Sequence, residues 1–265
     1  MIPTLAERRR YYQAALRFAR LSRAVIGRGR ARGFRTRLKA DDSFVTDVDL
    51  AVERALRAAI RRAFPAHGIF GEELPPENPK ADFQWILDPI DGTTSFKNGI
   101  PFYGTIIGLR HRGRPLVGVI DLPALDRCYS AGRGLGAWCD GRRLRVHDVA
   151  PKAVRRQVIS AGDRARFVMC GAGGAFDRLL REYPNARGYV DCIAHVFAAE
   201  GLIGAAVDYG IKLWDIAATE LLVREAGGRY VESYRSSGPE PRTYGIICGK
   251  ASVVRKLERL FSARR

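Results

Sequence analysis

The sequence predicts a mixed α/β fold, built as one large domain or as two tightly joined halves. The chain has 265 residues, enough to bury a sizeable core. Its first 64 residues contain two stretches with the periodicity of amphipathic helices. Beyond residue 150, segments that favour strands alternate with segments that favour helices, which is typical of an α/β arrangement. We predict an N-terminal half over residues 1–148 and a C-terminal half over residues 149–265.

The two N-terminal helices have recognisable ends. Residues 5–27 carry apolar side chains at close to helical spacing, and we expect Gly27 and Gly29 to end this helix. The second helix should begin after a Thr-x-x-Asp pattern at residues 46–49 and end at Pro65. That pattern is typical of a capping box, so it has a structural explanation before any functional one.

Charge and composition limit the class of protein. The net charge of +17 attracts anions such as nucleic acid, membrane surfaces or phosphorylated metabolites. Residues 8–39 contain twelve Lys or Arg and no acid, without stacking aromatics or a nucleic-acid motif. We interpret them as a solvated basic face, with a nucleic-acid-binding protein as the less favoured alternative. Five scattered cysteines favour a reducing, cytoplasmic compartment, and no apolar run is long enough to cross a membrane.

The stretch with the densest chemistry is residues 85–96, Trp-Ile-Leu-Asp-Pro-Ile-Asp-Gly-Thr-Thr-Ser-Phe. We expect a buried strand whose ladder fails at Pro89, because proline has no N–H. Asp88 and Asp91 repel each other unless a cation lies between them, and oxygen ligands suit Mg²⁺, Mn²⁺ or Ca²⁺. The glycine and two threonines at residues 92–94 offer N–H and hydroxyl groups to a phosphate.

Further acidic residues stand at two other places. Glu72 and Glu73 follow an apolar Ile-Phe pair and precede a Pro-Pro turn, which favours ligands over ordinary surface charges. Asp215 follows Trp214 at the start of a helix expected to run to Ala226. An acid in the first turn of a helix is also an ordinary choice, because the helix dipole favours it.

Taken together, these motifs resemble the inositol monophosphatase superfamily of Mg²⁺-dependent phosphomonoesterases. The resemblance rests on K-x-D-x-x-x-V-T-x-x-D at residues 39–49, G-E-E at 71–73, W-I-L-D-P-I-D-G-T at 85–93 and W-D-x-A at 214–217. It implies an α-β-α-β-α sandwich shared with fructose-1,6-bisphosphatase, and commonly a homodimer.

The resemblance also implies metal ligands. Glu72, Asp88 and the Ile90 carbonyl would hold one Mg²⁺. Asp88, Asp91 and Asp215 would hold a second, so that Asp88 bridges the two ions. A third, weaker ion near Glu72 fits the same pattern, and Mn²⁺ is an alternative metal.

Catalytic and phosphate-binding roles follow from the same resemblance. Glu72 and the Thr93 hydroxyl would position the attacking water, and Asp49 would accept a hydrogen bond from Thr93. The phosphate group would be bound by Asp91, Gly92, Thr93 and Thr94.

Local features resemble the histidinol-phosphatase branch more than the inositol enzymes. They are P-F-Y-G-T-I-I at residues 101–107, G-I-K-L-W-D at 210–215 and V-D-C at 190–192. Asp191 could pair with the ammonium group of histidinol phosphate, although a helix cap would also account for it. Asp208 stands where inositol enzymes carry a glutamate that contacts a sugar hydroxyl, so it fits either substrate. We expect histidinol phosphate, which belongs to histidine biosynthesis, with inositol 1-phosphate as the alternative.

Overall fold

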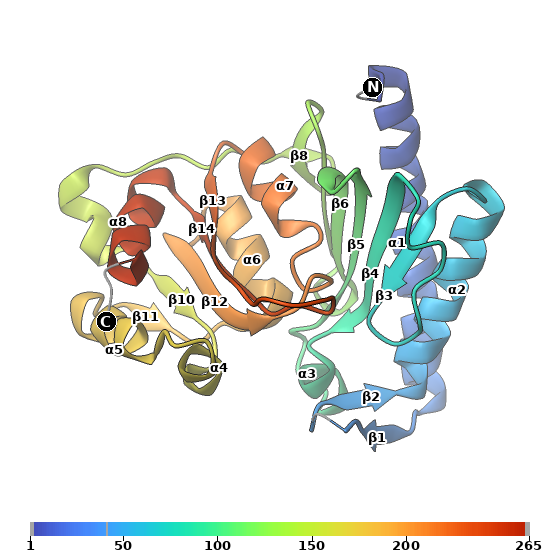
Figure 1. Ribbon diagram of the computed structural model, residues 1–265, viewed down its shortest axis with the longest axis horizontal. Helices are drawn as coiled ribbons and strands as arrows, with labels where there is room; N and C mark the ends of the chain where they lie inside the picture. Colours follow the sequence, from blue (N-terminus) through green and yellow to red (C-terminus); the bar gives the residue numbers. More distant parts are fainter. Residues whose placement is uncertain (1–2, 41, 263–265) are drawn as a thin grey trace.

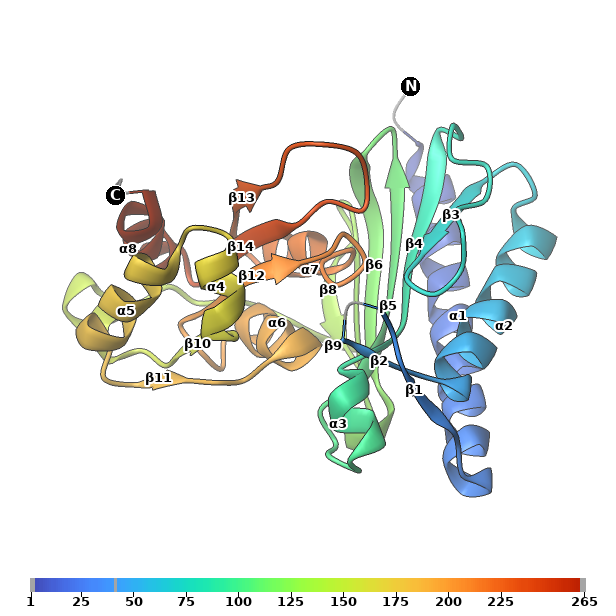
Figure 2. The same ribbon diagram turned by 60° about the horizontal axis from the view of Figure 1, so that its bottom comes forward.

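The α-helices and strands stack in alternating layers (Figure 1). The structure is a computed structural model and describes residues 3–40 and 42–262. Its α-helices are α1 (Leu5–Arg32), α2 (Asp47–Ala63), α3 (Thr93–Lys97), α4 (Arg164–Met169), α5 (Gly173–Glu182), α6 (Asp191–Glu200), α7 (Thr219–Glu225) and α8 (Ala251–Ser262). Helices α1 and α2 cover one sheet, α6 and α7 lie between the two sheets, and α4, α5 and α8 cover the second sheet (Figure 2). This is the predicted α-β-α-β-α sandwich.

Two large sheets form the β layers of the described residues. The first has the order β3 (Gly68–Gly71), β4 (Phe83–Asp91), β5 (Gly104–His111), β6 (Arg114–Leu122), β7 (Arg127–Gly132), β8 (Gly136–Cys139), β9 (Arg142–Arg143). The second has the order β11 (Ala186–Arg187), β10 (Ile159–Ala161), β12 (Ala205–Ile211), β14 (Tyr244–Gly249), β13 (Arg229–Arg235). A small hairpin of β1 (Thr36–Leu38) and β2 (Phe44–Thr46) precedes α2. The predicted boundary at residues 148–149 falls between β9 and β10, and the division into halves stays a prediction.

Apolar side chains fill the spaces between the layers. On α2, Val52, Leu56 and Ile60 form the predicted apolar stripe and are buried in one cluster with Trp85 of β4. A second cluster joins the two sheets through α6 and α7, and a third lies under α4, α5 and α8. Burial of these faces is the main source of stability that such layers have.

Helix α1 is longer than the sequence predicts. It continues through Gly27 and Gly29 to Arg32 and ends at Gly33, whose φ is 76°. A Cβ atom at Gly29 would lie 2.6 Å from Val48 Cγ2 of α2, so this glycine lets the two helices pack closely. Tertiary packing therefore outweighs the low helix propensity of glycine.

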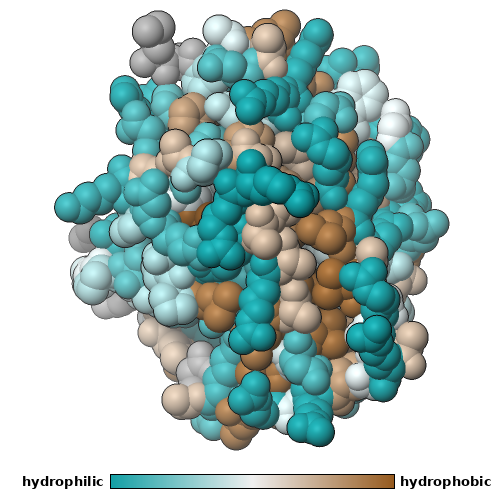
Figure 3. All heavy atoms as spheres, turned by 90° about the vertical axis from the view of Figure 1, so that its right-hand side faces the viewer, coloured by the Kyte–Doolittle hydropathy of each residue, from teal (hydrophilic) through white to brown (hydrophobic). Residues whose placement is uncertain are grey.

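The basic residues between 8 and 39 belong to α1 and the β1–β2 hairpin. Figure 3 faces the α1–α2 side and shows hydrophilic side chains spread over it. Several of the cations nevertheless have partners: Arg23 forms an ion pair of 2.7 Å with Asp121, and Arg30 donates to the Tyr103 hydroxyl at 3.0 Å. The interpretation as a solvated face therefore applies to the others, such as the exposed Arg17. None of the described helices combines the length and apolar character that crossing a membrane requires.

Two glycines allow the segment before α7 to approach the first sheet. Gly108 of β5 and Gly118 of β6 are partners in the strand register. A Cβ at Gly108 would lie 2.6 Å from the Ala217 carbonyl oxygen, and a Cβ at Gly118 would lie 2.8 Å from Ala218 Cα. The absence of side chains at these two positions thus brings the neighbourhood of Asp215 against the sheet that carries Asp88.

We predict that Gly108→Ala lowers the free energy of unfolding by about 1–3 kcal/mol, because the added methyl group overpacks this contact. Gly27→Ala is the matched control, since a Cβ there meets nothing within 4 Å. In the helix interior that substitution should instead raise the free energy of unfolding by about 0.5–1 kcal/mol. Urea unfolding of both variants measures the difference, and equal effects would contradict the close-packing argument.

Candidate active site

The site begins where β4 ends. Regular pairing of β4 with β5 extends to Asp88, becomes irregular, and resumes at Asp91. The ladder therefore fails at Pro89, as predicted from its missing N–H. The Pro89 carbonyl is not left unpaired, because the Thr105 hydroxyl donates to it at 2.8 Å. This irregular strand end holds two aspartates three residues apart in fixed, largely buried positions.

Asp215 joins these two aspartates from a distant part of the chain. The carboxylates of Asp88, Asp91 and Asp215 each offer one oxygen, and these oxygens lie within 4.8 Å of one another. The predicted helix begins at Thr219 rather than at Trp214, because the segment before α7 forms turns with bonds between residues three apart. In this turn the Asp215 carboxylate accepts from the Lys212 N–H at 2.7 Å. The tight turn, rather than a helix, orients Asp215.

The electrostatics of the three aspartates fit a cation. Burial, followed by the charge of Glu72, raises the pKa of Asp88 well above its usual value and that of Asp215 to about 7. Burial and the nearby Asp191 raise the pKa of Asp91 in the same direction. Asp88 Oδ1 is buried and has no hydrogen-bond partner among the described residues. An oxygen-rich cluster with an unsatisfied buried acceptor is the donor set that Mg²⁺ or Mn²⁺ prefers.

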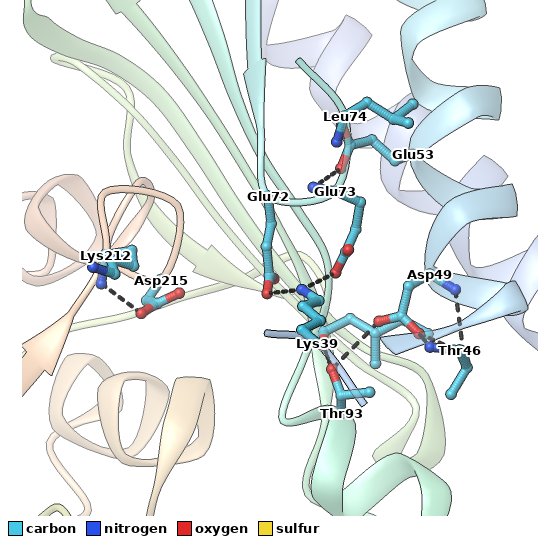
Figure 4. Close-up of polar contacts among 11 residues, drawn as sticks. Lys39, Thr46, Asp49, Glu53, Glu72, Glu73, Leu74, Thr93, Lys212 and Asp215 are labelled. Atoms are coloured by element: carbon cyan, nitrogen blue, oxygen red, sulfur yellow. Dashed lines mark hydrogen bonds and ion pairs between the residues drawn. The ribbon is translucent and has the colours of Figure 1, made fainter. Parts of the chain in front are cut away.

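Glu72 and Glu73 extend this acidic cluster from the end of β3. The Lys39 ammonium binds both carboxylates at 2.7 Å, between the two side chains (Figure 4). Burial opposes the charge on Lys39, but the two glutamates raise its pKa. Burial and the charge of Glu72 raise the pKa of Glu73 to about 7. Figure 4 also shows Asp215 on a different part of the chain from Glu72.

A buried ion pair shapes the loop that carries these glutamates. Glu53 of α2 is paired with Arg57 at 2.7 Å, and both side chains are almost fully buried. The Glu53 carboxylate also accepts from the Glu73 N–H at 2.8 Å and from the Leu74 N–H at 3.2 Å. A Cβ at Gly71 would collide with this carboxylate, so the glycine is required. Sequence reasoning missed the role of Glu53, because an acid inside a helix carries no signal of a partner 20 residues away.

Thr46, Asp49 and Thr93 form a hydrogen-bonded group. The predicted capping box is confirmed: Asp49 accepts from the Thr46 N–H at 2.8 Å, and Thr46 accepts from the Asp49 N–H. The Thr93 hydroxyl lies 3.4 Å from Asp49 Oδ1 and 3.0 Å from the Ile90 carbonyl oxygen. Burial raises the pKa of Asp49 to about 6. The same aspartate thus caps α2 and faces Thr93.

Gly92 and Thr94 lie beside this group at the start of the short helix α3. Gly92 has a φ of 81°, and a Cβ there would lie 2.7 Å from the Phe102 carbonyl oxygen. The first N–H groups of a helix have no partner within the helix. Both residues and Thr93 line the same cavity as the aspartates.

Residues from the second sheet and from α6 close the other side of this cavity of about 610 Å³. The Asp91 carboxylate accepts from the Cys192 N–H and so fills a capping position at the start of α6. The alternative explanation of Asp191 as a helix cap does not hold, because it is the first helical residue and Val190 holds the cap position without a side-chain bond. Asp191 and Asp208 instead line the cavity.

The cavity contains charged residues to which the sequence analysis assigns no role. Lys39 binds Glu72, which lines the cavity, and Arg166 and Lys212 line the wall that comes from α4 and the end of β12. No motif surrounds Arg166 in the sequence, so only the folding of α4 over β12 shows that its side chain lines the cavity. Lys212 belongs to the G-I-K-L-W-D segment at residues 210–215 and could have been noticed there.

The layered fold and the motifs around this cavity are shared with known proteins. A model of the inositol monophosphatase family matches residues 7–263. The histidinol-phosphatase of Chlorobaculum parvum is 38% identical over 191 residues, which cover 72% of this chain and 73% of that protein. The Nus factor SuhB of Pasteurella multocida is 34% identical over 233 residues, covering 84% and 87%. The solved structure of extragenic suppressor protein suhB from Bartonella henselae has a TM-score of 0.82 at 26% identity, covering 96% and 98%.

The chain therefore belongs to the inositol monophosphatase family. Members of this family are phosphoric monoester hydrolases and generally depend on Mg²⁺. The acidic cluster of Asp88, Asp91 and Asp215 agrees with that dependence.

We predict that chelation with EDTA lowers the melting temperature at pH 8 more than at pH 5. Unfolded aspartates titrate near 3.8, whereas Asp215 in the folded chain has a pKa of about 7. The folded chain then binds more protons than the unfolded chain between these values, so its stability without metal falls as pH rises from about 4 to about 7. Added Mg²⁺ should restore the melting temperature at pH 8.

The control for this measurement is Asp215→Asn, which removes one of the three charges. Its melting temperature should depend less on pH and on Mg²⁺ than that of the wild type. A wild-type protein equally stable at both pH values after chelation would contradict the assignment of the acidic cluster to a cation.

Proposed function

We propose that this phosphatase hydrolyses histidinol phosphate, using two Mg²⁺ ions with room for a weaker third. The choice of histidinol phosphate as the substrate depends on a pair of acids beside the proposed phosphate position. The carboxylate of Asp191 has no hydrogen bond or ion pair with any described residue, and it lines the cavity together with Asp208. Asp208 accepts from the Tyr209 N–H through Oδ1 and has His195 within 3.7 Å of Oδ2, so the two acids together still offer carboxylate oxygens to a cationic group on the substrate.

The metal ligands we propose come from three places in the fold. Glu72, Asp88 and the Ile90 carbonyl would hold one ion, and Asp88, Asp91 and Asp215 the other. Convergence of the three aspartates and the unsatisfied Asp88 Oδ1 support this assignment. When bound, the ions would neutralise the phosphoryl oxygens, stabilise the leaving oxygen and make a water molecule more acidic. Mn²⁺ has the same ligand preference and is an alternative.

The residues of the chain would bind the phosphate and orient the attacking water. The N–H groups of Gly92, Thr93 and Thr94 would donate to the phosphate at the start of α3, since the first N–H groups of a helix have no partner within the helix. Glu72 would accept a hydrogen bond from the water, and the Thr93 hydroxyl would fix its direction. Asp49 would hold that hydroxyl, since its Oδ1 lies 3.4 Å from Thr93 Oγ1. No covalent intermediate with a side chain is needed, because the site activates water directly.

The second half would recognise the leaving group. Asp191 Oδ2 would lie 3.2 Å from a Cβ placed on Gly92, so the acid reaches the edge of the phosphate position. Burial and the charge of Asp208 raise the pKa of Asp191 to about 6, and a substrate ammonium group would offset this cost. The 38% identity with a histidinol-phosphatase supports the same substrate. Inositol 1-phosphate remains the alternative, because an acid at residue 208 also accepts from a hydroxyl.

We further propose a cytoplasmic homodimer. The five cysteines are free thiols in the structure, which suits a reducing compartment, and the family resemblance supports the dimer.

Asp88→Asn is expected to lower kcat/KM by at least about a hundredfold, because Asp88 would serve both ions. Phosphate release at saturating Mg²⁺ measures this loss. Asp126→Asn is the matched control: its side chain is 91% exposed, and asparagine tolerates its φ of 49°. Near wild-type turnover of Asp88→Asn would disprove the bridging role.

The substrate is tested by phosphate release with Mg²⁺ from histidinol phosphate, inositol monophosphates, fructose 1,6-bisphosphate and phosphoadenosine phosphate. We expect the highest kcat/KM for histidinol phosphate. Asp191→Asn should reduce its advantage over inositol 1-phosphate about tenfold or more, since a charged hydrogen bond is lost. A wild-type preference for an inositol phosphate would reject the proposed substrate and leave the metal site unaffected.

A further inference from the structure

A buried histidine lies behind the acids proposed to bind the substrate ammonium group. His195 of α6 is 1% exposed and lines the same cavity as Asp191 and Asp208. Its Nε2 atom is buried and has no hydrogen-bond partner among the described residues. A buried polar atom without a partner is costly, so its presence at a cavity calls for a functional explanation.

The neighbours of His195 determine how its ring is oriented. Its Nδ1 lies 3.1 Å from the hydroxyl of Thr219, a fully buried residue at the start of α7. Its Nε2 lies 3.7 Å from Asp208 Oδ2, just beyond hydrogen-bond distance. When Thr219 donates to Nδ1, a neutral ring carries its proton on Nε2, on the side of Asp208.

Asp208 is held firmly at one oxygen and loosely at the other. Its Oδ1 accepts from the Tyr209 N–H at 3.0 Å. Its Oδ2 has only His195 within ion-pair distance among the described residues. Asp191 precedes His195 by four positions on α6, so the two side chains share a helix face. The three side chains therefore meet at one end of the cavity.

We propose that His195 is a positioning residue that fixes Asp208 for binding the substrate ammonium group, with Thr219 setting the position of the ring proton. The N–H at Nε2 would donate to one oxygen of Asp208 and leave the carboxylate turned toward the cavity. Asp191 would then bind the ammonium group from the other side. This inference rests on the proposed function and adds that specificity depends on Thr219 and His195, which need not contact the substrate.

The test compares kcat/KM for histidinol phosphate with kcat/KM for inositol 1-phosphate, which has no amine. His195→Leu removes the donor to Asp208, and His195→Gln keeps an N–H donor. Thr219→Val removes the hydroxyl with little change in shape, and Thr219→Ser keeps it. Thermal unfolding and the Mg²⁺ concentration for half-maximal rate are measured for each variant.

We expect His195→Leu and Thr219→Val to lower the ratio of the two kcat/KM values about tenfold or more, mainly through a higher KM for histidinol phosphate. His195→Gln and Thr219→Ser should recover much of the ratio. An equal loss on both substrates, or no loss in any variant, would overturn the inference.

Failure of the proposed function has a different signature. It appears in the wild type alone, as a preference for inositol 1-phosphate over histidinol phosphate. If the wild type prefers histidinol phosphate and Thr219→Val folds but keeps the full ratio, the role of Thr219 and His195 is rejected while the substrate stands.

Discussion

Repulsion among buried carboxylates is the constraint on which the rest of this structure depends. Asp88, Asp91 and Asp215 come from two separate segments, yet their oxygens lie within 4.8 Å of one another. Burial raises the pKa of each aspartate, so their charged forms are unfavourable without a cation. Only a rigid scaffold can hold such groups together, since a loose one would let them separate.

Several local features supply that rigidity. The glycine pair Gly108 and Gly118 lets the segment before α7 rest on the first sheet. The N–H of Cys192 binds Asp91 and so ties α6 to the end of β4. Glu53 holds the backbone after β3 through two N–H groups. These contacts join both sheets around the cavity, which explains why the site lies between the layers rather than on either one.

The cavity also separates two chemical tasks. The end of β4, helix α3 and the turn that holds Asp215 provide the acids and the N–H groups that suit cations and phosphate. The second sheet and α6 provide Asp191, Asp208 and His195 at the other end. Because Asp191, Asp208 and His195 are not themselves among the three clustered aspartates, the side chains at the leaving-group end can vary while the acidic cluster is kept. This separation agrees with a family whose relatives carry different functional names.

The sequence by itself determined the fold class, the capping box of Thr46 and Asp49, and the acids around β4. Each of these can be inferred from short contiguous motifs. The sequence placed the end of α1 too early, because packing outweighs the low helix propensity of glycine. It also placed the start of α7 too early, because the Trp-Asp pattern is a local signal that does not show the turn formed in the folded chain. Only the tertiary structure decided the partners of Asp91, the support from Glu53 and the position of His195. Those depend on contacts between residues 20 to about 100 positions apart, which no local pattern encodes.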